Sequence, residues 1–341
     1  MKVLVTGGTG FLGSHTVAQL VAAGHEPRVL ARSRDRVAPA LRIHELDASA
    51  VEVALGDITD AASVVEAVQG CDAVVHAAAI YSYDPRDAEA MRTVNASGAR
   101  TVVTAALDAG AQRVIHVSST VALARMQKDA RIPITAPVGD LVGVYARSKQ
   151  ESDRVVRELQ AQGAPVVRMH PAGILGPRDP HQNETNVAVR NLVRGTPPVF
   201  SKERFQYCDV RDCAATLVAL AEGRGDDEPA WYPPLHEVDA VAELEAVTGR
   251  RLRVLRLDSG FLYRATVPAN ALIARLPRSV DALQSDGALM MAQRNLFVDD
   301  AAYERLGVTR TPTSDMFRDT VAWLVRQGEL SAKKAGAAAT S

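Results

Sequence analysis

The stretch Thr6-Gly7-Gly8-Thr9-Gly10-Phe11-Leu12-Gly13 decides the fold of this 341-residue chain. It follows an apolar run at residues 2–5 and opens a segment, residues 11–23, whose apolar residues recur with helical spacing. A glycine-rich turn between a strand and a helix is suited to a dinucleotide, because its backbone approaches the pyrophosphate and the helix N-terminus offers free N–H groups. The candidate cofactor-binding residues of the turn are Gly7, Thr9, Gly10, Phe11, Leu12 and Gly13.

Strand-like and helix-like segments alternate outward from this turn. The strand-like runs are residues 2–5, 28–31, 51–55, 73–75, 113–117 and 166–169, and the helical segments are 11–23, 61–68, 87–109 and 145–162. Strands that are separated by helices pair in parallel through right-handed crossovers. The pattern therefore predicts an α/β fold, a doubly wound parallel Rossmann sheet with helices on both faces.

The pattern changes after Pro171, where prolines and glycines cluster up to residue 198. Helical segments return at residues 210–221, 238–248 and 314–327. We expect a smaller mixed α/β C-terminal lobe that binds the substrate. The expected division is an NAD(P)-binding domain at 1–170 with 205–221 packing back on it, a substrate-binding lobe at 171–330 and a flexible tail at 331–341.

Composition argues against several kinds of partner. Lys and Arg total 39 against 40 Asp and Glu, so no basic field exists to attract nucleic acid or an anionic membrane. No run approaches the ~20 apolar residues that span a bilayer, and the N-terminus does not resemble a signal peptide. Cys71, Cys208 and Cys213 match neither a disulfide framework nor a zinc site. We expect a cytoplasmic protein with free thiols and no metal.

The end of the second strand bears on the choice of cofactor. NAD-selective sites carry an acidic residue about 20 residues past the glycines. Here Ala31 occupies the strand end and Arg32 follows, and Asp35 lies past the strand end. Because a guanidinium can pair with a 2′-phosphate, the sequence favours NADP(H), and NAD(H) stays open.

Two further motifs indicate proton transfer to a carbonyl. Tyr145 and Lys149 are four residues apart, which places them one turn apart on one face of a helix. A neighbouring ammonium favours the phenolate of a tyrosine, whose ordinary pKa near ~10 is too high for efficient proton transfer. Ser118-Ser119-Thr120 follows an apolar strand, where a doubly wound sheet binds its ligands. We expect a hydroxyl there to polarise the substrate oxygen.

In combination these motifs resemble the extended branch of the short-chain dehydrogenase/reductase superfamily, the NAD-dependent epimerase/dehydratase family. The residues that carry the resemblance are the glycine turn, Gly56-Asp57, His76-Ala77-Ala78-Ala79, Asn95-Ala96-Ser97-Gly98, Ser118-Ser119, Tyr145 to Lys149, and Pro171 with Gly176-Pro177. The run from Tyr81 to Pro85 and the basic strand end look most like the dihydroflavonol-4-reductase-like and 3β-hydroxysteroid dehydrogenase-like members. One departure is His170, where the family often has arginine before the proline.

The resemblance implies a role for each matching residue. Tyr145 is the expected proton donor or acceptor, Lys149 holds the nicotinamide ribose and lowers the pKa of Tyr145, and Ser119 orients the substrate oxygen. The remaining implied cofactor contacts are Asp57 and Ile58 beside the adenine, Ala77, Ala78 and Ala79 along the cofactor, and Pro171 beside the nicotinamide. Thr120 is the alternative to Ser119. Asn95 and His76 are expected to be structural.

The substrate lobe is less informative. Tyr81, Tyr83, Phe200, Phe205 and Tyr207 could line an apolar pocket or fill a core, and Tyr81 and Thr120 are the substrate-contact candidates. Arg190 and Arg194 lie four residues apart and could meet an anionic substrate, but a solvated helix face is the favoured interpretation.

Three functions follow from this pattern. An NADP(H)-dependent oxidoreductase acting on a small-molecule ketone, aldehyde or alcohol is favoured. A nucleotide-sugar epimerase or dehydratase with the same three catalytic residues and a non-catalytic NAD(P)-sensing protein remain open. The resemblance makes a homodimer through the two long helices natural.

Overall fold

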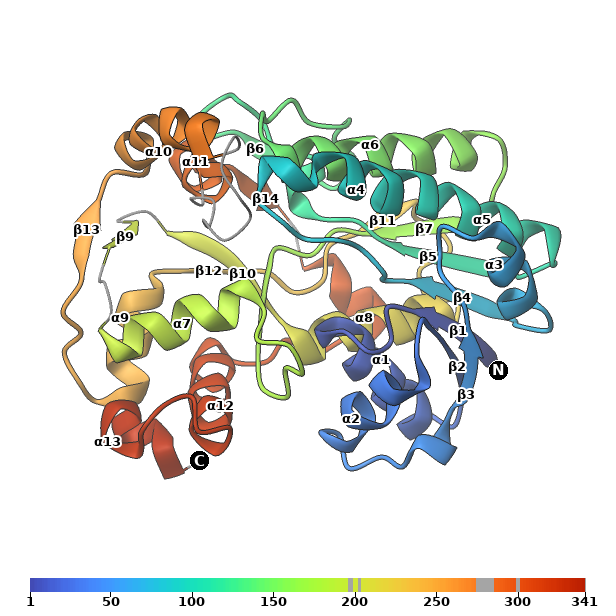
Figure 1. Ribbon diagram of the computed structural model, residues 1–341, viewed down its shortest axis with the longest axis horizontal. Coiled ribbons are helices and arrows are strands. Elements are labelled where there is room, and N and C mark those ends of the chain that lie inside the picture. The colour runs from blue at the N-terminus through green and yellow to red at the C-terminus, as the bar shows by residue number, and fades with distance from the viewer. Residues whose placement is uncertain (196–198, 202–203, 274–284, 299–300, 341) are drawn as a thin grey trace.

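A computed structural model describes residues 1–195, 199–201, 204–273, 285–298 and 301–340 of the chain. Its centre is a seven-stranded parallel sheet with the strand order β11-β7-β5-β4-β1-β2-β3 (Figure 1). The strands are β1 (Lys2–Thr6), β2 (Glu26–Ala31), β3 (Glu52–Leu55), β4 (Ala73–His76), β5 (Arg113–Val117), β7 (Val166–Met169) and β11 (Ala230–Trp231). The order reverses between β1 and β4, and ligands of such sheets bind at the carboxyl ends of the strands beside this reversal. The predicted Rossmann sheet is confirmed.

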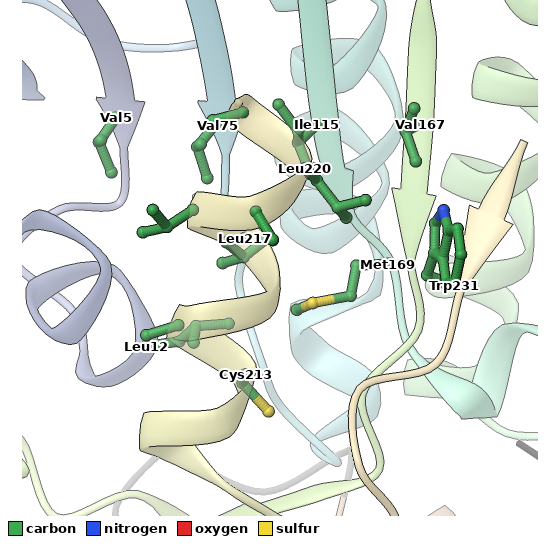
Figure 2. Close-up of a cluster of buried hydrophobic side chains, with 14 of the residues drawn as sticks. Val5, Leu12, Val75, Ile115, Val167, Met169, Cys213, Leu217, Leu220 and Trp231 are labelled. Atoms are coloured by element: carbon green, nitrogen blue, oxygen red, sulfur yellow. The ribbon is translucent and has the colours of Figure 1, made fainter. Parts of the chain in front are cut away.

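Helices cover both faces of the central sheet. On one face lie α1 (Phe11–Ala22) and α8 (Val210–Ala221), and on the other lie α3 (Ala61–Val68), α5 (Gly98–Asp108) and α6 (Val144–Ala161). Successive strand residues point to opposite faces. Val3 and Val5 accordingly pack with the α1 and α8 side chains, whereas Leu4 packs with those of α3 and α5. Figure 2 shows Leu217 and Leu220 on α8, close to the strands that carry Val75 and Ile115.

Two segments of the first half differ from the sequence-based expectation. The helix predicted at 87–109 is divided into α4 (Ala88–Met91), a wider π turn (Arg92–Ser97) and α5. A short helix that was not predicted, α2 (Val37–Arg42), follows the second strand and buries Val37 and Leu41. Neither feature leaves a strong periodic signal, because one is a local change of helical pitch and the other spans only six residues.

The C-terminal lobe is built from small sheets. β8 (Gly173–Leu175), β10 (Phe205–Asp209) and β12 (His236–Val238) form a three-stranded mixed sheet. β9 (Val199–Ser201) pairs with β13 (Leu255–Leu257), and β6 (Arg131–Pro133) pairs with β14 (Leu296–Val298). The helices of this part are α7 (Glu184–Arg194), α9 (Ala240–Thr248), α10 (Ser259–Ile273), α11 (Ser285–Gln293), α12 (Thr313–Arg326) and α13 (Ala332–Ala335). The mixed α/β character predicted for this lobe agrees with these elements.

The end of the chain differs from the flexible tail expected at residues 331–341. Within the described part, residues 332–335 form α13, and the Ala335 and Ala338 side chains are fully buried. They pack in one cluster with side chains of α9 and α12. Figure 1 shows α13 beside α12. An alanine-rich composition resembles a disordered tail, but small side chains also allow a helix to lie close against its neighbours.

Candidate active site

The glycine turn joins β1 to α1 as expected. Gly7 has a φ of +73°, and a Cβ atom there would lie 2.7 Å from the backbone nitrogen of Ala78. Gly10 is different, because a Cβ atom there would come within 4 Å of only the Gly7 carbonyl oxygen, at 3.2 Å. Gly10 also precedes α1 without providing a side-chain cap for its first N–H groups. Free N–H groups beside an open glycine fit an approaching pyrophosphate.

The strand ends beyond the turn carry the residues expected near the adenine. Arg32 directly follows β2, has an exposed side chain and has no ion-pair partner among the described residues. The Asp57 carboxylate accepts hydrogen bonds from the Thr59 backbone N–H (2.9 Å) and hydroxyl (2.8 Å). The Thr59 hydrogen bonds and the Arg32 charge hold the pKa of Asp57 below its usual value. Ile58 is buried against Gly98.

The loop after β4 lies beside the glycine turn. The Ala78 backbone N–H donates to the Thr6 hydroxyl (3.2 Å), and His76 Nδ1 lies 2.7 Å from the same oxygen. Burial lowers the pKa of His76 to about 3, so this ring is neutral. Ala77 lines the reaction chamber defined below, whereas Ala79 is exposed. His76 therefore has the packed environment that the sequence suggested.

Ser119, Tyr145 and Lys149 come together at the carboxyl end of β5. The Ser119 hydroxyl accepts a hydrogen bond from the Val121 N–H (3.3 Å) and also forms a hydrogen bond with Tyr145, which lies in the first turn of α6. Lys149 follows one turn later, and its Nζ donates to the Val117 carbonyl oxygen at 3.5 Å. All three side chains are largely buried.

The protonation of Tyr145 and Lys149 follows from their burial. Burial raises the pKa of Tyr145 above its usual value, the Tyr83 phenol adds to this rise, and the Ser119 hydrogen bond acts against it. The influence that lowers the pKa of Tyr145 here is the Ser119 hydrogen bond and not the charge of Lys149, as had been expected, and Tyr145 is a protonated phenol at neutral pH. Burial lowers the pKa of Lys149 to about 8, while Asp153 acts in the opposite direction.

These side chains border a cavity of about 520 Å³, here called the reaction chamber. Among the expected residues its lining includes Phe11, Leu12, Ala77, Tyr81, Ser119, Thr120, Tyr145, Lys149 and Pro171. The Tyr81 ring lies edge-on to Tyr145 with centroids 4.5 Å apart, and its hydroxyl donates to that of Tyr83 at 2.6 Å. Phe205 and Tyr207 also line the chamber, while the Phe200 side chain lies outside the described residues.

The two arginines of α7 are held by an ion pair instead of facing this chamber. Arg190 Nη1 lies 3.1 Å and Arg194 Nη2 3.2 Å from the Glu329 carboxylate. Neither belongs to the chamber lining. Asn183 and Thr185, at the start of the same helix, do line the chamber, although no sequence motif had drawn attention to them.

Asp153 is a buried residue of this site that the sequence analysis missed. Its carboxylate accepts hydrogen bonds from the Ser118 hydroxyl (3.0 Å) and His170 Nε2 (2.9 Å). It also accepts from Arg157 Nε (2.6 Å) and Arg168 Nη1 (3.3 Å). Although burial acts to raise the pKa of Asp153, these partners hold it well below the usual value.

Asp153 lies where its carboxylate can connect several elements of the site. Ser118 directly precedes Ser119, His170 directly precedes Pro171, and Asp153 lies two turns after Tyr145 on α6. One carboxylate thus joins α6, which carries Tyr145 and Lys149, to the ends of β5 and β7, which lead to Ser119 and Pro171. The available signal was its spacing, because Asp153 continues the Tyr145 and Lys149 series at intervals of four residues.

Comparisons with known proteins agree with this arrangement. The model of the NAD dependent epimerase/dehydratase family matches residues 3–231. The chain belongs to this family. The chain is 28% identical over 336 residues to a putative dihydroflavonol 4-reductase of Synechocystis sp., covering 95% of this chain and 94% of the relative. It is 32% identical over 286 residues to a 3-beta-hydroxysteroid dehydrogenase of Mycolicibacterium neoaurum, covering 77% and 75%.

A solved structure gives the same result. The crystal structure of gox2253 superposes with a TM-score of 0.79 at 26% identity, covering 96% of this chain and 99% of that one. The resemblance to the extended short-chain dehydrogenases/reductases is therefore confirmed, and the chain is an enzyme of that class, a reductase, dehydrogenase or epimerase. No helix among the described residues combines the length and apolar character needed to cross a membrane.

Proposed function

We propose that this enzyme is an NADP(H)-dependent oxidoreductase that reduces a ketone or aldehyde, or oxidises the corresponding alcohol. The observation that carries the proposal is the hydrogen bond between Ser119 and the protonated Tyr145 phenol, in a chamber that Lys149 and Pro171 also line. Tyr145 is in the protonation state required to donate a proton to a carbonyl oxygen. The chamber lies beside the glycine turn, since Phe11 and Leu12 of α1 form part of its lining.

The proposed chemistry distributes the two hydrogens between cofactor and protein. The reduced nicotinamide, when bound, supplies the hydride that the carbonyl carbon receives. Ser119 donates a hydrogen bond to the carbonyl oxygen, and Tyr145 transfers its phenolic proton to that oxygen as charge develops there. Lys149 would hold the nicotinamide ribose, and its positive charge would stabilise the phenolate that remains on Tyr145. The phenolate then recovers its proton from solvent, so the reaction consumes one proton overall.

The preference for NADPH rests on the end of β2. Ala31 is buried where an acidic residue would receive the ribose hydroxyls of NAD, and Arg32 is exposed beside it. A guanidinium without an ion-pair partner among the described residues can make a bidentate contact with a 2′-phosphate. The positive charge of Arg32 also contributes to the lowered pKa of Asp57 at the end of the neighbouring strand β3.

The test follows NADPH and NADH consumption across aldehydes, diketones, aryl ketones, ketosteroids, flavanonols and nucleotide-sugar ketones. The wild type is compared with Tyr145→Phe. Turnover with NADPH that disappears in the variant, together with much slower turnover with NADH, is the expected result. If the protein binds the cofactor tightly but consumes no NADPH or NADH with any carbonyl compound, the proposed reductase function is contradicted. Conversion of a nucleotide sugar without net cofactor consumption would instead identify an epimerase, and no conversion at all a cofactor-sensing protein.

A further inference from the structure

A second cavity, of about 690 Å³, lies against the reaction chamber. We call it the distal chamber. The two cavities share five lining residues, namely Thr120, Ala172, Phe205, Met290 and Met291. Both volumes fall within the ~300–1,000 Å³ typical of small-molecule sites. A small aldehyde would need only the first of them.

The inner wall of the distal chamber offers little to a polar ligand. It includes the buried side chains of Ala124 and Leu141, together with Leu296 and Phe297 of β14. The Gln206 amide is already bound at both ends, because it accepts from the Phe297 N–H at 2.8 Å and donates to the Phe297 carbonyl oxygen at 2.9 Å.

Several other polar side chains of the wall are also engaged, although Arg131 and Gln293, which line it too, make no side-chain hydrogen bond within the described residues. The Asn295 amide oxygen accepts from the Arg125 N–H at 2.6 Å. Arg294 forms an ion pair with Asp129 at 2.6 Å, and Arg204 forms one with Glu237 at 3.3 Å. Replacing these partners with ligand hydroxyls or phosphates would exchange one set of hydrogen bonds for another at little gain. Hydrocarbon, by contrast, gains from leaving water.

We propose that the distal chamber binds an extended hydrocarbon portion of the substrate while the carbonyl lies between Ser119 and Tyr145. This rests on the proposed carbonyl reductase function and names its substrate class, a ketone or aldehyde carrying a long apolar group. Met290 and Met291 of α11 border both chambers, and unbranched thioether side chains adapt to apolar groups of different shape.

The test uses straight-chain 2-alkanones from 2-butanone to 2-undecanone as probes, with saturating NADPH. In the wild type, kcat/KM should rise by up to about fourfold for each methylene that enters the distal chamber. Leu296 lines the distal chamber but not the reaction chamber, so Leu296→Trp should fill the distal chamber alone. This variant should lose the rise for the longer ketones and keep kcat/KM for 2-butanone within twofold. Leu55→Trp, at an exposed position of β3, is the matched control and should behave as the wild type.

Two further measurements keep the outcome decisive. Leu296→Gln makes the same wall polar without adding bulk and should weaken only the long ketones, should the tryptophan variant not fold. Calorimetric binding of 2-undecanone to the NADP⁺-saturated protein separates this proposal from the reductase itself. Binding that Leu296→Trp abolishes supports the chamber even if no ketone is reduced, in which case the reductase fails alone. If kcat/KM depends on chain length equally in the wild type and in Leu296→Trp, or if both bind 2-undecanone equally, the proposed role of the distal chamber is overturned.

Discussion

The surroundings of the catalytic residues and those of the distal chamber differ in how firmly their side chains are held. Beside the catalytic residues, the buried Asp153 carboxylate has four fixed donors. Around the distal chamber, Met290, Met291 and Phe297 are only half-buried, and the neighbouring sheets have two or three strands. Together with the proposed role of the distal chamber, this difference leads us to infer that the large sheet fixes the reaction geometry and that substrate choice depends on a part that can repack.

The largest expected effect is a loss of catalytic rate when the proton donor is removed. Tyr145→Phe removes the proton donor and should lower kcat by about 10²- to 10⁴-fold. NADPH affinity, measured by fluorescence titration, should stay within severalfold because the ring remains. Tyr83→Phe is the control, since it removes a neighbouring hydroxyl that receives the Tyr81 hydrogen bond. Equal losses in the two variants would show that Tyr145 has no special chemical role.

The second prediction compares ion pairs in the two halves. Asp153→Asn leaves Arg168, only 4% exposed, with no neutralising carboxylate and should cost roughly 3–5 kcal/mol of unfolding free energy. Arg194→Ala breaks a partly exposed pair with Glu329 in the C-terminal lobe and should cost at most about 1 kcal/mol. Urea unfolding of both variants measures the difference. Similar losses would contradict the proposed contrast between the two halves.

The third prediction concerns pH. Because burial lowers the pKa of Lys149 to about 8, this ammonium is charged below that pH and neutral above it. If Lys149 must be charged, kcat/KM for NADPH should fall up to about tenfold per pH unit above pH 8, since this constant reports the free enzyme. In Lys149→Arg the fall should disappear, because a guanidinium stays protonated. A fall at the same pH in this variant would assign the titration to another group.

The smallest effect is expected at the solvent-exposed end of β2. Arg32→Ser should raise the Kd of NADPH severalfold to tenfold and leave that of NADH unchanged, because only NADPH carries the 2′-phosphate. Raising the salt concentration should weaken NADPH binding more in the wild type than in the variant. Arg36→Ser, a nearby exposed arginine, is the matched control. Unchanged NADPH affinity in Arg32→Ser would remove the basis for the proposed preference.

The features that could be predicted from the sequence are those determined by residues close together in the chain. The glycine turn, the strands of the first half and the spacing of Tyr145 and Lys149 depend on neighbouring residues, and the structure places them as expected. Pairings between distant segments left no such signal. β6 and β14 are separated by more than 160 residues, and their three-residue strands are too short to show a period. The role of Asp153 was hidden for the same reason, because Ser118 and His170 reach it only through the tertiary fold.

The last strand of the central sheet has a consequence for protein engineering. β11 reaches the sheet edge only after the chain has passed through β8, α7 and β10. Its Trp231 is buried there (Figure 2), and the indole N–H donates to the Gly225 carbonyl oxygen. A chimera cut after β7 would therefore lack both α8 and this edge strand. To transplant substrate selectivity between relatives, the exchange should keep α8 and β11, residues 210–231, with the nucleotide-binding part and replace the segments on either side of them, β10 included because it pairs with β8 and β12.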